Sequence, residues 1–207
     1  MKLKWHGHAC FSIALNDGTV IVTDPFDDSV SYPPCGARAD YVLSSHGHHD
    51  HDNFASVAGE PVIFNTPGSH DIPGARITAT PCFHDDAAGA KRGDNLIFRV
   101  EADGLALAHL GDLGHLPRTQ AQRAALTGLD VMLIPIGGYY TIETPQAVEI
   151  IRAFRPRCAV GMHFKNRYCS YPITDEKEFL RLTDGQVLPN EIEITGETPV
   201  GCFVMEI

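Results

Sequence analysis

The stretch "SSHGHHDHDN", residues 44–53, points most directly to the fold and the chemistry of this chain. It contains four histidines and two aspartates within seven positions, residues 46–52. The preceding run "YVLSS" is short and rich in β-forming residues, which predicts a strand that ends just before the first histidine. A loop at a strand end can direct neighbouring side chains to one point, because it is free of the alternation of a sheet.

A divalent cation needs three or four N, O or S donors at about 2.0–2.2 Å. The HxHxDH pattern offers two pairs of donors, His46 with His48 and Asp50 with His51. Four donors exceed what one open catalytic site usually takes from one loop, which indicates two adjacent metal ions. The alternative for this loop taken alone is a solvated polar turn.

Three later residues strengthen the metal interpretation, because each ends an apolar run. His84 follows "ITATPCF", Asp112 follows "LALAHLG", and His163 follows "CAVGM". A polar residue in this position leaves the core and enters a cleft, and ligands on rigid strands form a preorganised site. These donors predict the remainder of the metal site.

Hydrophobic patterns along the chain predict strands first and helices later. Two hairpins are expected, with turns at residues 16–18 and at Asp103-Gly104. Three helices are expected at residues 118–126, 144–154 with Thr144 as N-cap, and 174–183 with Thr174 at the start. This order predicts a layered α/β architecture, and the length of 207 residues predicts one domain over residues 1–207.

Composition narrows the partners. The chain has 16 basic and 26 acidic residues, a net charge of −10, which disfavours nucleic acid and anionic membrane surfaces. It has no run of about eighteen apolar residues that could span a membrane. Six scattered cysteines without a CxxC pair, and no apolar leader, predict a reducing cytoplasmic location. We expect a small-molecule substrate, with anionic compounds included, while the sequence carries no signal for the oligomeric state.

The ordered segments "HGHHDH", "FHD", "LGD" and "GMHF" resemble the metallo-β-lactamase superfamily. "GHACF", "TDP" and "PIGGYYTI" extend the likeness to the branch of small metal-dependent hydrolases that includes L-ascorbate-6-phosphate lactonase. Together these segments run from about residue 5 to residue 170. The resemblance implies an α/β fold, a four-layer αββα sandwich of two mixed β-sheets with helices on the outer faces.

The resemblance also implies how the donors are shared between two divalent ions. The first ion would be held by His46, His48 and His84, the second by Asp50, His51 and His163, and both would be bridged by Asp112. Zinc is expected first, although these donors also suit manganese or iron. Two cations about 3.5–4 Å apart lower the pKa of a bridging water, and the resulting hydroxide attacks carbon or phosphorus. Ester, lactone and phosphoester hydrolysis all fit.

Four catalytic residues are predicted. Asp50 could orient the attacking water by accepting its hydrogen bond, and Asp112 would bridge the two ions. His8 could contact substrate or donate a proton, and His115 could reach the leaving group. Each of these two histidines has an alternative as a packing or solvated residue.

Other residues have supporting interpretations. Asp24 could orient a metal-binding histidine, and any of Lys91, Arg92 and Lys165 could bind an anionic substrate. An alternative from another class is a metal-binding sensor or binding protein with this fold and no significant turnover. The complete donor set argues against it.

Overall fold

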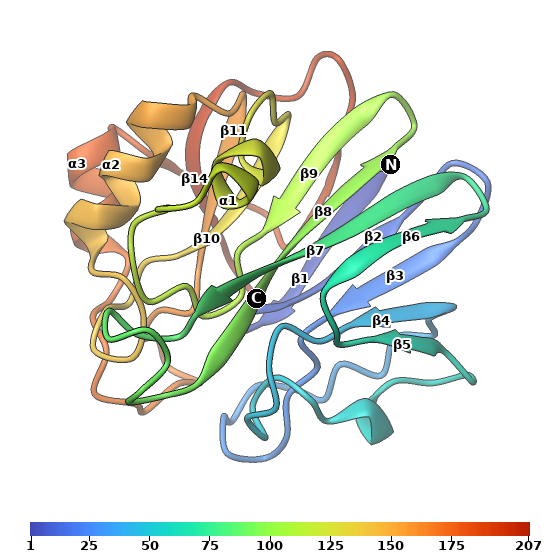
Figure 1. Ribbon diagram of the computed structural model, residues 1–207, viewed down its shortest axis with the longest axis horizontal. Coiled ribbons are helices and arrows are strands. Elements are labelled where there is room, and N and C mark those ends of the chain that lie inside the picture. The colour runs from blue at the N-terminus through green and yellow to red at the C-terminus, as the bar shows by residue number, and fades with distance from the viewer.

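The computed structural model describes residues 1–207 as two β-sheets packed face to face, with three α-helices (Figure 1). The strands are β1 (Lys2–Gly7), β2 (Cys10–Ala14), β3 (Val20–Thr23), β4 (Tyr41–Leu43), β5 (Val62–Phe64), β6 (Gly68–Ile72), β7 (Ala75–Phe83), β8 (Asp94–Ala102), β9 (Leu105–His109), β10 (Val131–Pro135), β11 (Cys158–Met162), β12 (Gln186–Leu188), β13 (Glu191–Glu193) and β14 (Gly201–Met205). The helices are α1 (Gln120–Ala125), α2 (Thr144–Phe154) and α3 (Lys177–Thr183), with a 3-10 turn η1 (Phe54–Ser56).

The first sheet has six strands in the order β13-β1-β2-β3-β4-β5. Its first four strands are antiparallel, whereas β3, β4 and β5 run parallel. The predicted hairpin at residues 16–18 joins β2 to β3, where Gly18 has a positive φ of 93° that suits a residue without Cβ. The sheet is therefore mixed, as expected.

The second sheet has eight strands in the order β12-β14-β11-β10-β9-β8-β7-β6. Strands β9, β10, β11, β14 and β12 are parallel, and β6 to β9 form an antiparallel meander. The hairpin predicted at Asp103-Gly104 joins β8 to β9. This sheet is also mixed, which confirms the predicted pair of mixed sheets.

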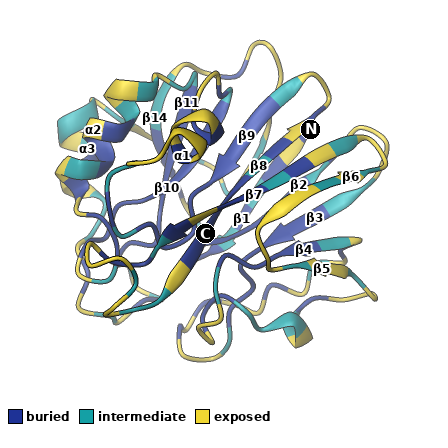
Figure 2. Ribbon diagram, in the orientation of Figure 1, coloured by how far each residue is buried: buried dark blue, intermediate teal, exposed yellow.

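One apolar core fills the space between the two sheets (Figure 2). Phe11 and Ile21 of the first sheet and Phe98 and Leu107 of the second are fully buried in it. Strands β10 and β11 are buried at every position because helices cover the outer face of their sheet. The helices α1, α2 and α3 all pack on this second sheet (Figure 1). All three α-helices therefore belong to the layer that covers the second sheet.

Two helix starts differ from the predictions. Helix α2 begins at Thr144 itself, and Glu143 is the N-cap, because the Thr144 hydroxyl donates a hydrogen bond to the Ile136 carbonyl. Helix α3 begins at Lys177 and not at Thr174. Both the backbone N–H and the hydroxyl of Thr174 donate to the Gly137 carbonyl, which holds that residue outside the helix. None of the helices has the length and apolar character needed to cross a lipid bilayer.

Strand direction brings the chemical residues together. Strands β1, β3 and β4 run the same way in the first sheet, and β7, β9 and β11 run the same way in the second. The carboxyl ends of each set therefore lie at one edge of their sheet. The two edges meet where the backbone N–H of His163 donates to the His8 carbonyl at 3.1 Å.

Candidate metal centre

The first donor group consists of three imidazoles, His46, His48 and His84, whose ligand atoms lie within 4.8 Å of one another. His46 and His48 follow β4, and His84 follows β7, so the group joins both sheets. The ring centroids of His46 and His84 are 4.7 Å apart, and those of His48 and His84 are 5.1 Å apart. All three members were predicted to share one ion.

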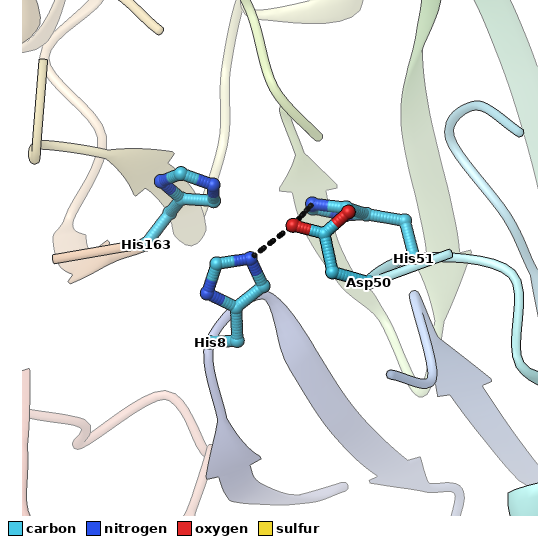
Figure 3. Close-up of side chains that lie close together, drawn as sticks. All are labelled: His8, Asp50, His51 and His163. Carbon is cyan, nitrogen blue, oxygen red and sulfur yellow. Dashed lines mark hydrogen bonds and ion pairs between the residues drawn. The ribbon is translucent and has the colours of Figure 1, made fainter. Parts of the chain in front are cut away.

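The second donor group contains Asp50, His51 and His163, again as predicted, together with His8 (Figure 3). These four residues are all buried, and their ligand atoms also lie within 4.8 Å of one another. His8 follows β1 and has a positive φ of 51°, and His163 follows β11 with a φ of 52°. Such backbone strain in residues other than glycine is typical of functional sites.

Asp112 lies between the two groups. Its Oδ2 is 3.1 Å from His84 Nε2 on the first side, and 3.2 Å from His163 Nε2 and 3.4 Å from His51 Nε2 on the second. Its other oxygen, Oδ1, is buried and has no hydrogen-bond partner. One carboxylate thus touches both donor groups, which is the position expected for a bridging ligand.

Gly111 and Asn95 hold the Asp112 loop in place. The Asn95 side-chain oxygen accepts a hydrogen bond from the Asp112 backbone N–H at 3.0 Å. Gly111 has a φ of 52°, and a Cβ there would overlap Asn95 and Ser45. Asn95, which supports the site from within β8, was not among the residues predicted from the sequence.

Asp24 supports the second donor group from behind. Its fully buried carboxylate accepts hydrogen bonds from the Ser45 backbone N–H at 2.7 Å, the Ser45 hydroxyl at 2.6 Å and His51 Nδ1 at 2.9 Å. Because a carboxylate only accepts, His51 must carry its proton on Nδ1, which turns Nε2 toward Asp112. This matches the orienting role predicted for Asp24.

Burial and charge set the protonation of the first group and of Asp112. Burial, reinforced by His51, lowers the pKa of His46 to about 2, so His46 is neutral at pH 7. Burial opposes ionisation of Asp112, but His163 and His51 outweigh it and hold the pKa of Asp112 well below its usual range. A neutral imidazole beside an ionised carboxylate is the protonation pattern of metal ligands.

The second group is divided, because the pKa of His51 is raised whereas that of His8 is lowered. Burial opposes protonation of His51, but Asp112 and Asp24 outweigh it and hold the pKa of His51 well above its usual range. Burial and His163 lower the pKa of His8 to about 4, although its contact with Asp50 opposes that shift. His8 Nε2 and Asp50 Oδ2 are 3.2 Å apart, and the His8 ring lies 4.1 Å from the His163 ring. Burial disfavours ionised Asp50, but His8 and His51 prevail and depress the pKa of Asp50.

The donor set fits divalent cations. His46 Nε2, His51 Nε2 and Asp112 Oδ1 are buried atoms without a hydrogen-bond partner. Buried polar atoms are rarely left unsatisfied in proteins, so such a cluster calls for a ligand. Five imidazoles and two carboxylates suit zinc, manganese or iron.

His115 does not join these residues. Its Nε2 accepts from the Phe83 backbone N–H at 3.1 Å, and its Nδ1 donates to the Leu116 carbonyl at 2.7 Å. With both ring nitrogens bonded to backbone, the geometry favours a structural role, and the predicted catalytic role of His115 stays untested.

A cleft of about 500 Å³ opens over the two donor groups. Five predicted ligands reach it, namely His48, Asp50, His84, Asp112 and His163. Its other walls come from Ser29, His49, Arg92, Tyr140 and Tyr171. This volume suits a small molecule.

Comparison with known proteins identifies the family. A model described as the beta-lactamase superfamily domain matches residues 2–163. The UPF0173 metal-dependent hydrolase of Thermoplasma acidophilum is 31% identical over 189 residues, covering 79% of this chain and 83% of the relative. The UPF0173 metal-dependent hydrolase of Methanoculleus marisnigri is 32% identical over 189 residues, covering 79% of this chain and 81% of the relative.

A solved structure agrees with these relatives. The protein from Thermotoga maritima, described as a candidate Zn-dependent hydrolase of the metallo-beta-lactamase superfamily, superposes with a TM-score of 0.82. The two chains are 33% identical, and the match covers 99% of this chain and 97% of the other. The predicted fold and family resemblance are therefore confirmed. The chain belongs to the metallo-β-lactamase superfamily, among relatives named UPF0173 metal-dependent hydrolases.

Proposed function

We propose that this protein is a dinuclear metal-dependent hydrolase of small esters, lactones or phosphoesters. The observation that carries the proposal is the contact of Asp112 Oδ2 with His84 on one side and His163 and His51 on the other. A single ion would need only one of these groups. The names of the relatives, metal-dependent hydrolases, support the same reaction class.

The ligand roles follow from the two groups. The first ion would be held by His46, His48 and His84, the second by Asp50, His51 and His163, and Asp112 would contact both. Bound divalent cations would supply an activated water at neutral pH and stabilise negative charge on the reacting oxygen. Zinc is the ion that we expect first.

Asp50 and His8 would act as a pair beside this water. Asp50 Oδ2 accepts from His8 Nε2, which fixes the carboxylate and leaves Asp50 Oδ1 to accept a hydrogen bond from the attacking water. His8 does not line the cleft. We therefore assign His8 a positioning role through Asp50, rather than direct proton donation to the substrate.

Hydrolysis of a small panel tests the function. Protein loaded with zinc or manganese would be assayed against lactones, phosphodiesters, phosphomonoesters, a thioester and a β-lactam, with Asp112→Ala as the blank. Turnover of one class well above that blank supports the proposal and assigns the bond that is cleaved. Equal rates for the wild type and Asp112→Ala would contradict it.

The second candidate is a metal-binding sensor with this fold. The complete set of seven donors disfavours it, because a sensor needs no water-orienting Asp50. It would be supported if the protein bound two metal ions per chain, bound small anions reversibly in the cleft, and cleaved none of the panel.

A further inference from the structure

One cation in the cleft, Arg92, has no carboxylate partner and no hydrogen-bond acceptor within the protein. The Arg92 guanidinium carbon lies 5.4 Å from the centroid of the Tyr140 ring, in a cation–π contact. The guanidinium makes no salt bridge and no side-chain hydrogen bond. Its N–H donors therefore have no acceptor within the protein, and Arg92 lines the cleft.

We propose that Arg92 binds a carboxylate or phosphate group of the substrate, at a point remote from the bond that is cleaved. The proposal rests on the hydrolase function above and specifies its substrate class, a small acid. A guanidinium matches both anions with two parallel hydrogen bonds, and stacking on Tyr140 keeps its edge available.

The other cations considered from the sequence are directed elsewhere. Lys91, the preceding residue, is exposed, and its ammonium pairs with Asp86 at 2.8 Å. Lys165 lines a separate hollow with Trp5 and the C-terminal residue Ile207. Arg92 is the only lysine or arginine among the residues that line the cleft.

The loop that carries Arg92 is built around a buried carboxylate, Asp85. The carboxylate accepts hydrogen bonds at 2.8–2.9 Å from the backbone N–H groups of Ala87, Gly89, Lys91 and Arg92. Burial opposes its ionisation, but these four N–H groups outweigh burial and lower the pKa of Asp85 to about 2. The backbone of Arg92 is thereby held in place.

This loop is also tied to the metal site. Asp85 directly follows the ligand His84, and Gly114 lies against both, since a Cβ on Gly114 would overlap their backbone. The distance from the Arg92 backbone to the donor groups is thus set by a short, hydrogen-bonded loop, and the contact with Tyr140 places the guanidinium. Such a fixed spacing selects a substrate by the separation between its anionic group and its reacting carbon or phosphorus.

Matched substrates test this selection. For the bond class that the panel identifies, three substrates would differ only in a remote methyl, carboxylate or phosphate group. In Arg92→Gln we expect KM for a charged substrate to rise about 10- to 100-fold more than KM for the methyl analogue, since a charge-assisted pair is lost. Arg92→Lys should restore part of the effect. The carboxylate and phosphate arms show which anion is preferred.

Lys91→Gln is the matched control, because it removes the same charge from the same loop outside the cleft. It should leave the ratio of the KM values unchanged, and all three variants should keep the metal content of the wild type. The proposal is overturned if Arg92→Gln changes KM for the charged and methyl substrates equally, or if Lys91→Gln has the larger effect.

A binding measurement keeps this inference separate from the hydrolase proposal. If the wild type cleaves none of the panel, the proposed function fails, but calorimetry with metal-loaded protein still tests Arg92. Glutarate and glycerol 3-phosphate should bind the wild type at least tenfold more tightly than Arg92→Gln. A direct contact of these anions with the metal ions would occur in the wild type and in Arg92→Gln alike, so it would not affect the ratio of the two affinities. Equal affinities would refute the role of Arg92.

Discussion

Replacing Asp24 by asparagine would keep the shape of a buried side chain and remove its charge. Because the Ser45 backbone N–H on Asp24 Oδ1 can only donate, the amide oxygen of asparagine would take the Oδ1 position. The amide nitrogen would then take the Oδ2 position, where it meets two donors, the Ser45 hydroxyl and His51 Nδ1. The simplest relief is for His51 to move its proton from Nδ1 to Nε2. That tautomer has no lone pair on Nε2, the nitrogen that faces Asp112.

The expected cost is a loss in affinity for the second metal ion. Partners that orient a metal-binding histidine typically contribute a factor of about 10–100, or about 1.4–2.8 kcal/mol. The first donor group does not contain His51 and should keep its ion. Titration of metal-free protein against a competing chelator would resolve the two affinities, with metal content measured after dialysis.

Asp27→Asn is the matched control, because Asp27 also pairs with a histidine, His49 at 3.3 Å, outside both donor groups. It should leave both metal affinities unchanged. Near-wild-type far-UV circular dichroism would show that Asp24→Asn is folded. An unchanged second affinity in folded Asp24→Asn would refute the reasoning that Asp24 sets the tautomer of His51.

Three further outcomes are expected. Gly114→Ala should lower the free energy of unfolding by about 1–3 kcal/mol, because its Cβ would overlap the backbone of His84 and Asp85. Gly196→Ala, where a Cβ meets nothing within 4 Å, is its control in urea denaturation, and equal losses would contradict the overlap. Metal-free protein should lose stability as pH falls from 6.5 to 4, because His8, with a pKa of about 4, stays neutral while the unfolded chain takes up a proton. The share of this loss due to His8, measured as the difference between the wild type and His8→Gln, should level off at about 3 kcal/mol. His46, with a pKa of about 2, contributes to the total loss in both proteins, and identical profiles would exclude a contribution of His8. Chelation should lower the Tm, since metal at a thousand times its Kd stabilises by about 4 kcal/mol, and zinc should restore it; an unchanged Tm would show that metal does not bind the folded chain.

The donor positions were predictable because each one follows a strand. His84, Asp112 and His163 end apolar runs, and the parallel directions of β7, β9 and β11 bring such ends to one edge. The two hairpins were predictable for a local reason as well, because their turn residues need positive φ. These features depend on neighbours in the sequence.

Features that depend on distant partners were not predictable in the same way. His8 pairs with Asp50, 42 positions away, and is not among the residues that line the cleft. Asp85 organises a loop through four backbone N–H groups, which no side-chain pattern records. The short strands β12 and β13, of three residues each, are too brief to show periodicity.

Lys91 and Arg92 illustrate the same limit at a single loop. The two cations are adjacent and chemically similar, so composition and spacing cannot separate them. The fold separates them, because Lys91 pairs with Asp86 while Arg92 reaches Tyr140 and the cleft. Substrate preference therefore depends on loop conformation, even where the metal ligands follow from the sequence.

The central claim is that Asp112 joins two metal ions in one site. The most direct test is metal stoichiometry by mass spectrometry of the wild type and Asp112→Ala, after reconstitution with zinc and dialysis. We predict two ions per chain in the wild type, loss of at least the second ion in Asp112→Ala, and a folded variant. One ion per chain in the wild type, or two ions retained by Asp112→Ala, would contradict the claim.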